Sequence, residues 1–127
     1  MNSANRTTFD ASALLALLLD EPGADGLRER QPDAVISAVN IAEVLAKLVS
    51  RGVPLPEAQS VIDALHMEVL PFDALSASIS GKFVRKGVSL GDRCFLAAAL
   101  QTGGGWTSDR ELAAVAGGMI PNLQFFR

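Results

Sequence analysis

Short stretches rich in β-branched and aromatic residues alternate with longer segments rich in alanine and leucine along the whole chain. The first kind is typical of strands and the second of helices. Strands are predicted at residues 6–9, 34–37, 68–72, 103–107 and 123–126. Helices are predicted at residues 11–19, 24–30, 40–51, 54–66, 73–87, 89–100 and 109–116. Because a helix between parallel strands must cross a face of the sheet, we expect a three-layer α/β/α domain with a central parallel sheet of four to five strands.

The composition predicts one folded domain over residues 1–127, because 49% of the residues are hydrophobic and only 20% are charged. The longest apolar run, Ala11–Leu19, has nine residues. About 20 are needed to span a bilayer, so we expect no membrane segment. The N-terminus lacks the basic and apolar regions of a secretion signal, and the single cysteine, Cys94, cannot form an internal disulfide. These features favour a reducing, cytoplasmic setting.

The chain contains one histidine and one cysteine, which limits the chemistry open to it. The two cannot assemble a zinc site of the Cys/His kind, and a Ser-His-Asp triad would depend on His66 alone. We interpret His66 as a helix-end residue, Cys94 as a small packing residue and Trp106 as part of the core. Carboxylate oxygens are the remaining candidates for a metal-binding or reactive site.

Acidic residues follow the predicted strands or, in one case, begin an inserted helix, at the edge of the sheet where ligands bind in folds of this kind. They are Asp10, Glu43, Asp73, Asp92 and Asp109. Each has a structural alternative, because acidic side chains stabilise the first turn of a helix and cap its free amides. The spacing of a capping box occurs in Ser89–Asp92, Ser108–Glu111 and Asn40–Glu43. We interpret Asp73 as a plain cap.

Helical periodicity distinguishes three of the other acids. At about 100° per residue, Asp92 shares a stripe with Phe95, and Asp109 shares one with Leu112, so both are predicted to face the core. Asp10 similarly precedes apolar helix positions. A carboxylate directed toward a core is costly to bury without a partner, and burial raises its pKa. This placement indicates a bound cation.

Glu43 lies opposite the apolar stripe of its helix and four residues before Lys47, so a solvated Glu–Lys pair explains it equally well. Its position after the second strand keeps it a candidate. If Asp10, Glu43, Asp92 and Asp109 converge, a bound metal must offset their repulsion. Ligation by oxygen alone suits Mg²⁺, with Mn²⁺ as a possible substitute.

Setting those four acids aside turns the net charge of −3 slightly positive, which allows a polyanion as a partner. The candidate phosphate contacts are Lys82, Arg85, Lys86, Arg93 and Arg110. Helix-end charge and ordinary solubility are the structural alternative for these residues.

Four blocks of the sequence resemble the acidic blocks of PIN domains, in particular those of the VapC toxins of type II toxin–antitoxin pairs. The blocks are Phe9–Leu15, Ser37–Val44, Leu90–Ala97 and Thr107–Leu112. They occur in the family's order and with its spacing over nearly the whole chain. The triple glycine before Trp106 departs from the family, which usually has β-branched residues in this strand.

The resemblance implies a PIN-like fold and a Mg²⁺-dependent endoribonuclease that cleaves RNA and is held inactive by a VapB-type antitoxin. It also implies a homodimer, with the early helices forming much of the antitoxin-binding groove. The residues that match the family's motifs are the acids Asp10, Glu43, Asp92 and Asp109 and the hydroxyls Ser12 and Thr107. The acids would be catalytic and metal-binding, and the hydroxyls would support them. Both hydroxyls could equally satisfy local backbone amides at the start of a helix. Because the chain offers no other base, a metal-activated water is expected to supply the nucleophile.

Two alternatives belong to other functional classes. A PIN-like module could bind RNA or a partner without cleaving it, although the four retained acids argue against this. A phosphoacceptor receiver domain would use Asp73 as its phosphorylated residue. Receivers, however, carry paired acids after the first strand and a lysine after the fifth. Here only Asp10 stands at the first place, and the lysines are Lys47, Lys82 and Lys86.

Overall fold

The computed structural model describes residues 6–127 and contains one five-stranded sheet, in which all neighbouring strands are parallel. The strands are β1 (Thr7–Phe9), β2 (Ala34–Ser37), β3 (Glu68–Leu70), β4 (Gly104–Thr107) and β5 (Asn122–Phe125). Their order across the sheet is β3-β2-β1-β4-β5, so β1 is central and β3 and β5 form the edges. The predicted parallel α/β sheet is confirmed.

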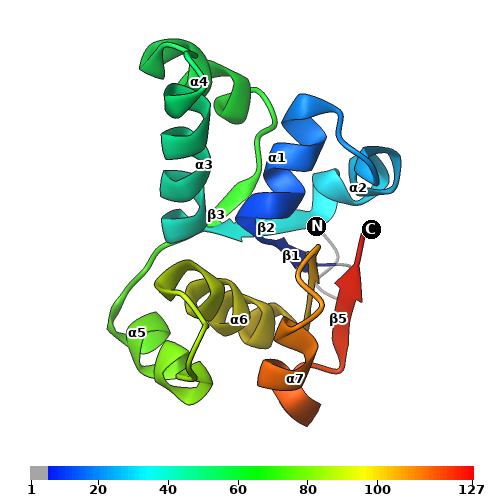
Figure 1. Ribbon diagram of the computed structural model, residues 1–127, viewed down its shortest axis with the longest axis vertical. Coiled ribbons are helices and arrows are strands. Elements are labelled where there is room, and N and C mark those ends of the chain that lie inside the picture. The colour runs from blue at the N-terminus through cyan, green and yellow to red at the C-terminus, as the bar shows by residue number, and fades with distance from the viewer. Residues whose placement is uncertain (1–5) are drawn as a thin grey trace.

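Helices cover both faces of this sheet. They are α1 (Ala11–Leu19), α2 (Ala24–Arg30), α3 (Ala38–Ser50), α4 (Leu55–Asp63), α5 (Ala74–Ser80), α6 (Leu90–Thr102) and α7 (Leu112–Ala116). In Figure 1, α1 to α4 occupy the upper half of the view and α5 to α7 the lower half, with the sheet between them. One apolar cluster includes Leu14, Val44 and Ile62 on the first side, and a second includes Phe95 and Leu112 on the other. The three predicted layers are therefore present.

The strand order excludes a receiver domain. Receivers have the order 2-1-3-4-5, whereas this sheet has the order 3-2-1-4-5. Asp73, which a receiver would phosphorylate, is exposed and caps α5 by accepting a hydrogen bond from the Ser76 amide at 2.9 Å. The prediction that Asp73 is a helix cap is confirmed.

The triple glycine joins the end of α6 to β4, and α6 packs closely on this strand. Gly103 ends α6 in the left-handed conformation, with φ of 95°, which glycine adopts without steric cost. A Cβ at Gly105 would lie 2.7 Å from Cζ of Phe95 and 3.1 Å from Cβ of Ala99. Glycine in β4 thus lets α6 pack directly on the strand backbone, which accounts for the departure from the family pattern.

Several helices have different ends from those predicted, and for two of them the local cause is clear. The helix expected from residue 40 begins at Ala38, because the Ser37 hydroxyl accepts a hydrogen bond from the Val39 amide at 3.3 Å and caps it. The helix expected to reach residue 87 ends at Ser80, whose hydroxyl donates to the Ala77 carbonyl at 2.7 Å. That bond competes with helix continuation, and Gly81 lowers helix propensity further. A short 3₁₀ turn over 81–83 then buries Phe83.

The described part of the chain, residues 6–127, has no helix that is both long enough and apolar enough to cross a membrane.

We predict that Gly105→Ala lowers the free energy of unfolding by about 1–3 kcal/mol, because the new methyl group overpacks the contact with Phe95. Gly26→Ala is the matched control, since Gly26 lies within α2 and a Cβ there has no neighbour within 4 Å. It should be neutral or slightly stabilising. Urea denaturation of both variants tests this, and equal unfolding free energies for Gly105→Ala and wild type would contradict the packing described.

Candidate active site

The sheet topology brings three of the predicted acidic segments to one edge. Phe9, the last residue of β1, pairs with Ile36 on β2 and Trp106 on β4. Asp10 follows directly, and its amide donates to the Trp106 carbonyl at 3.3 Å. Residues immediately after β1, β2 and β4 therefore lie next to one another.

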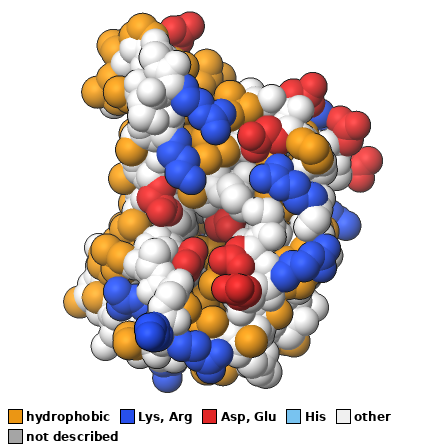
Figure 2. Space-filling model, viewed as in Figure 1, with side chains coloured by type: hydrophobic (Ala, Val, Ile, Leu, Met, Phe, Trp, Pro, Cys, Tyr) orange, Lys and Arg blue, Asp and Glu red, His pale blue; other side chains and the backbone are white. Residues whose placement is uncertain are grey.

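All four predicted acids line one pocket of about 140 Å³ at this edge. The remaining lining residues are Ala11, Ser12, Asn40, Lys47, Gly91 and Ser108. Figure 2 shows acidic side chains gathered around the middle of one face, with lysine and arginine side chains spread around them. The acids thus share a location, and their catalytic and metal-binding roles stay predictions.

Asp10 is the most deeply placed of the four, with only 9% of its surface exposed. It caps α1, because its Oδ1 accepts a hydrogen bond from the Ala13 amide at 2.8 Å. The same oxygen accepts from the Ser12 hydroxyl at 2.6 Å, and Oδ2 accepts from the Thr107 hydroxyl at 2.5 Å. Capping and pocket formation are therefore combined in one carboxylate.

Burial raises the pKa of Asp10 above its usual value of 3.8, because a desolvated carboxylate resists ionisation. The hydrogen bonds from Ser12, Thr107 and the Ala13 amide oppose this shift, and the negative charge of Asp92 adds to it. The pocket therefore contains a carboxylate whose charged form a nearby cation would favour.

Ser12 and Thr107 connect Asp10 to the segment after β4. The Thr107 hydroxyl accepts a hydrogen bond from the Asp109 amide at 3.0 Å while donating to Asp10. The Ser12 hydroxyl accepts from the Ser108 amide at 3.3 Å while donating to the other oxygen of Asp10. Both hydroxyls thus lie beside the carboxylate, as predicted, and fix its orientation.

Asp92 is half-buried in the first turn of α6. Its side chain accepts from the Ser89 amide at 3.2 Å, and its own amide donates to the Ser89 hydroxyl at 3.1 Å. This reciprocal pair is a capping box. Asp92 therefore caps α6 and also lines the pocket.

Asp109 differs from its prediction. It is exposed instead of facing the core, and α7 begins only at Leu112. The Asp109 Oδ1 accepts a hydrogen bond from the Glu111 amide at 3.0 Å, and its own amide donates to Thr107. These local bonds form a turn in place of the first helical turn, so the helical stripe expected for Asp109 does not exist.

The Glu43 carboxylate is hydrogen-bonded to a side chain of its own helix. Its Oε1 accepts a hydrogen bond from Nδ2 of Asn40 at 2.7 Å. Among residues 6–127, no ion pair joins Glu43 to Lys47, although both line the pocket. The Glu–Lys explanation is therefore wrong for this structure. The spacing of Asn40 and Glu43 predicts a capping box, but Ser37 caps this helix instead, and the side chains of Asn40 and Glu43 bind each other directly.

The candidate phosphate contacts lie around the pocket and do not line it. Lys82, Arg85 and Lys86 are exposed, and the last two line a second hollow that shares Asp109 with the first. Arg93 is half-buried. Arg110 lies over the Phe125 ring at 4.8 Å and donates to the Arg127 carbonyl at 3.2 Å. Arg110 is thus directed toward the end of β5.

The other single-copy residues lie outside the pocket. His66 is exposed just after α4, with φ of 51°. Cys94 is buried in α6, and desolvation raises the pKa of its thiol. Trp106 is half-buried against the core, with the Arg30 guanidinium 5.9 Å from its ring centre. Their predicted structural roles agree with these positions.

The donor chemistry of the pocket fits a hard divalent cation. The titratable ligands on offer are carboxylates, and one of them is buried beside a second negative charge. Within residues 6–127, no three Asp, Glu, His or Cys side chains form a ready-made metal cluster.

Comparison with known proteins identifies the family to which the chain belongs. Residues 8–118 match the PIN domain, so the chain belongs to the PIN domain family, whose members are generally nucleases. The predicted resemblance is confirmed. A solved chain described as "Toxin-antitoxin complex from Klebsiella pneumoniae" has 20% sequence identity and a TM-score of 0.70, over 95% of this chain and 98% of that chain. This likeness shows a shared fold. No curated protein matches the sequence.

We predict that Asp10→Asn raises the melting temperature in EDTA at neutral and alkaline pH, by roughly 3 °C. The raised pKa means that the folded state keeps this proton at pH values where the unfolded state has lost it. The stability contributed by protonated Asp10 is full below pH 3.8 and is lost as pH rises through the raised pKa. The advantage of the variant should therefore grow with pH.

Thermal unfolding from about pH 4 to about pH 8 measures this difference. Asp73→Asn is the control, because Asp73 is an exposed cap whose pKa is lowered by the hydrogen bond from the Ser76 amide. It should give no stabilisation at any pH. A melting temperature for Asp10→Asn below that of wild type throughout would show that burial of the charge is not costly.

Proposed function

We propose that the protein is a Mg²⁺-dependent endoribonuclease and acts as the toxin of a toxin–antitoxin pair. The observation that carries the proposal is the single pocket lined by Asp10, Glu43, Asp92 and Asp109 in a chain of the PIN domain family. The similarity in fold to a chain of a toxin–antitoxin complex supports the biological role. Mn²⁺ is the expected substitute metal.

When bound, Mg²⁺ would lower the pKa of a coordinated water and neutralise charge on the scissile phosphate. Asp10 and Asp92 are the carboxylates best placed to hold it, since their charges already act on each other. Ser12 and Thr107 keep Asp10 oriented by donating to both of its oxygens. Glu43 and Asp109 line the same pocket, where Glu43 would help to hold the ion and Asp109 would orient the attacking water.

RNA would lie across the face on which the pocket opens. The basic side chains around the acids supply charge for the phosphates that flank the cleaved bond. Arg85 and Lys86 are suitable candidates, because both are exposed and the hollow that they line includes Asp109.

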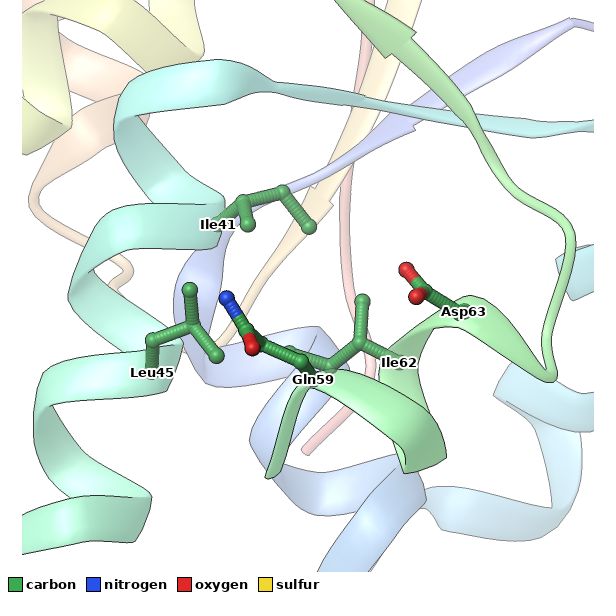
Figure 3. Close-up of a pocket in the computed structure, with 5 residues that line it drawn as sticks. All are labelled: Ile41, Leu45, Gln59, Ile62 and Asp63. Carbon is green, nitrogen blue, oxygen red and sulfur yellow. The ribbon is translucent and has the colours of Figure 1, made fainter. Parts of the chain in front are cut away.

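An antitoxin partner would pack on the early helices. A hollow of about 350 Å³ lies between α3 and α4, and Figure 3 shows Ile41, Leu45 and Ile62 around it beside Gln59 and Asp63. Such a mixture of apolar surface with a polar rim suits a peptide segment. The proposal of an antitoxin rests on the family and on the shared fold, and this hollow is a place where it could bind.

A homodimer is also expected from the family. The edge strand β3 and the segment after it expose Val69, Phe72 and Leu75, with 47%, 39% and 62% of their surfaces accessible. An apolar surface next to an open sheet edge is typical of an interface between protein chains.

We predict that Asp10→Asn and Asp92→Asn each reduce Mg²⁺-dependent RNA cleavage by at least 100-fold while the protein stays folded, because each removes a charged ligand. Cleavage of total RNA with Mg²⁺ and with EDTA measures this, and circular dichroism checks the fold. Asp73→Asn should cleave like wild type, since Asp73 lies outside the pocket. Cleavage that persists in both pocket variants, or in EDTA, would reject the site. RNA binding without cleavage by wild type would favour the non-cleaving module.

We predict that the double variant Arg85→Gln, Lys86→Gln binds single-stranded RNA more weakly in EDTA and with a smaller salt dependence. Each lost phosphate contact reduces the slope of log K against log salt by about 0.7. Arg28→Gln is the matched control, because Asp20 and Asp25 already neutralise Arg28. Fluorescence anisotropy at several salt concentrations measures the slopes, and an unchanged slope in the double variant would place the RNA elsewhere.

A further inference from the structure

Asn40 is an almost fully buried polar residue in the wall of the pocket, with 1% of its surface exposed. Its Nδ2 donates two hydrogen bonds, to Oε1 of Glu43 at 2.7 Å and to the Gly91 carbonyl at 3.1 Å. The amide therefore connects α3 to the first turn of α6, across 51 residues of sequence.

Gly91 faces the same carboxylate from the other side. A Cβ at Gly91 would lie 2.5 Å from Cδ of Glu43 and would overlap both carboxylate oxygens. The Glu43 carboxylate thus occupies the space that a side chain at residue 91 would fill. Asp92 is the next residue, so the backbone against which Glu43 packs is also the one that carries Asp92.

The energetics of Asn40 point beyond support of the fold. Its Oδ1 is buried and has no hydrogen-bond partner among the described residues. An unpaired buried acceptor lowers the free energy of unfolding, which offsets part of the stabilisation from the two hydrogen bonds that Asn40 donates. The bond to a carboxylate is nevertheless charge-assisted and directional, which makes it suited to fixing the position of an anion.

We propose that Asn40 is a positioning residue which, together with the absence of a side chain at Gly91, holds the Glu43 carboxylate against the first turn of α6 so that Glu43 and Asp92 serve one divalent cation. This inference rests on the proposed function, because the cation is that of the nuclease. Without Asn40, Glu43 would be free to turn toward Lys47, four residues along the same helix.

The contact itself is tested in metal-free protein by combining Gly91→Ala with Glu43→Ala. Gly91→Ala alone should lower the melting temperature in EDTA by about 2–4 °C, because the methyl group moves the carboxylate away and the buried amide of Asn40 loses a hydrogen-bond acceptor. In the Glu43→Ala background the same change should have little effect, since the three atoms nearest to the added Cβ belong to Glu43. Equal losses in both backgrounds would overturn the described packing and the inference with it.

The positioning role is tested by the affinity for Mn²⁺, measured by electron paramagnetic resonance of the free ion during titration. Asn40→Ala should bind Mn²⁺ about 10-fold to 100-fold more weakly than wild type, as is usual when a residue that orients a ligand is removed. Gly91→Ala should weaken Mn²⁺ binding in the same direction, and it serves as the second variant if Asn40→Ala does not fold.

Thr8→Val is the matched control for general destabilisation. Thr8 is fully buried, and its hydroxyl is hydrogen-bonded to that of Thr102 at 2.8 Å, away from the pocket. It should lower the melting temperature without changing the Mn²⁺ affinity. Wild-type affinity in both Asn40→Ala and Gly91→Ala, or an equal loss in Thr8→Val, would overturn this inference alone. A wild-type protein that binds no Mn²⁺ would overturn the proposed function as well.

Discussion

The Asp10 carboxylate is an anion that has been almost completely removed from water at the end of the central strand. Three hydrogen bonds compensate part of the desolvation, and a second carboxylate, Asp92, adds repulsion. Burial in such surroundings raises the pKa of the carboxyl group, and a positive charge nearby would favour its ionised form. The other groups of the pocket are arranged around this buried carboxylate.

The strand order brings these groups together at one edge of the sheet. Because β1 lies between β2 and β4, the segments that follow these three strands end side by side. Helix α6 belongs to the opposite layer, and its first turn reaches the same edge because Gly105 lets the helix pack close to β4 and Gly91 leaves room for Glu43. The two glycines therefore determine how closely α6 packs on β4 and on Glu43. Asn40 links α3 to α6 through its hydrogen bond to the Gly91 carbonyl.

The parts of the structure that depend on local pattern were predictable from the sequence. The strand and helix alternation, the Asp73 cap and the pairing of Ser89 with Asp92 all follow from neighbouring residues. The features that were not predicted depend on competing local hydrogen bonds or on contacts between residues far apart in the sequence. The turn at Asp109 replaces a helical turn because side-chain bonds to Thr107 and Glu111 compete with it. The bond from Asn40 to the Gly91 carbonyl could not be predicted, because it joins residues that only the tertiary fold brings together.

The most direct test of a shared metal site is a crystal structure of the protein grown with Mn²⁺, with the ion located by its anomalous scattering. The account predicts a peak inside the pocket, bound directly or through water to Asp10 and Asp92, with Glu43 still hydrogen-bonded to Asn40. An ion found only outside this pocket, or a pocket without an anomalous peak at saturating Mn²⁺, would contradict it.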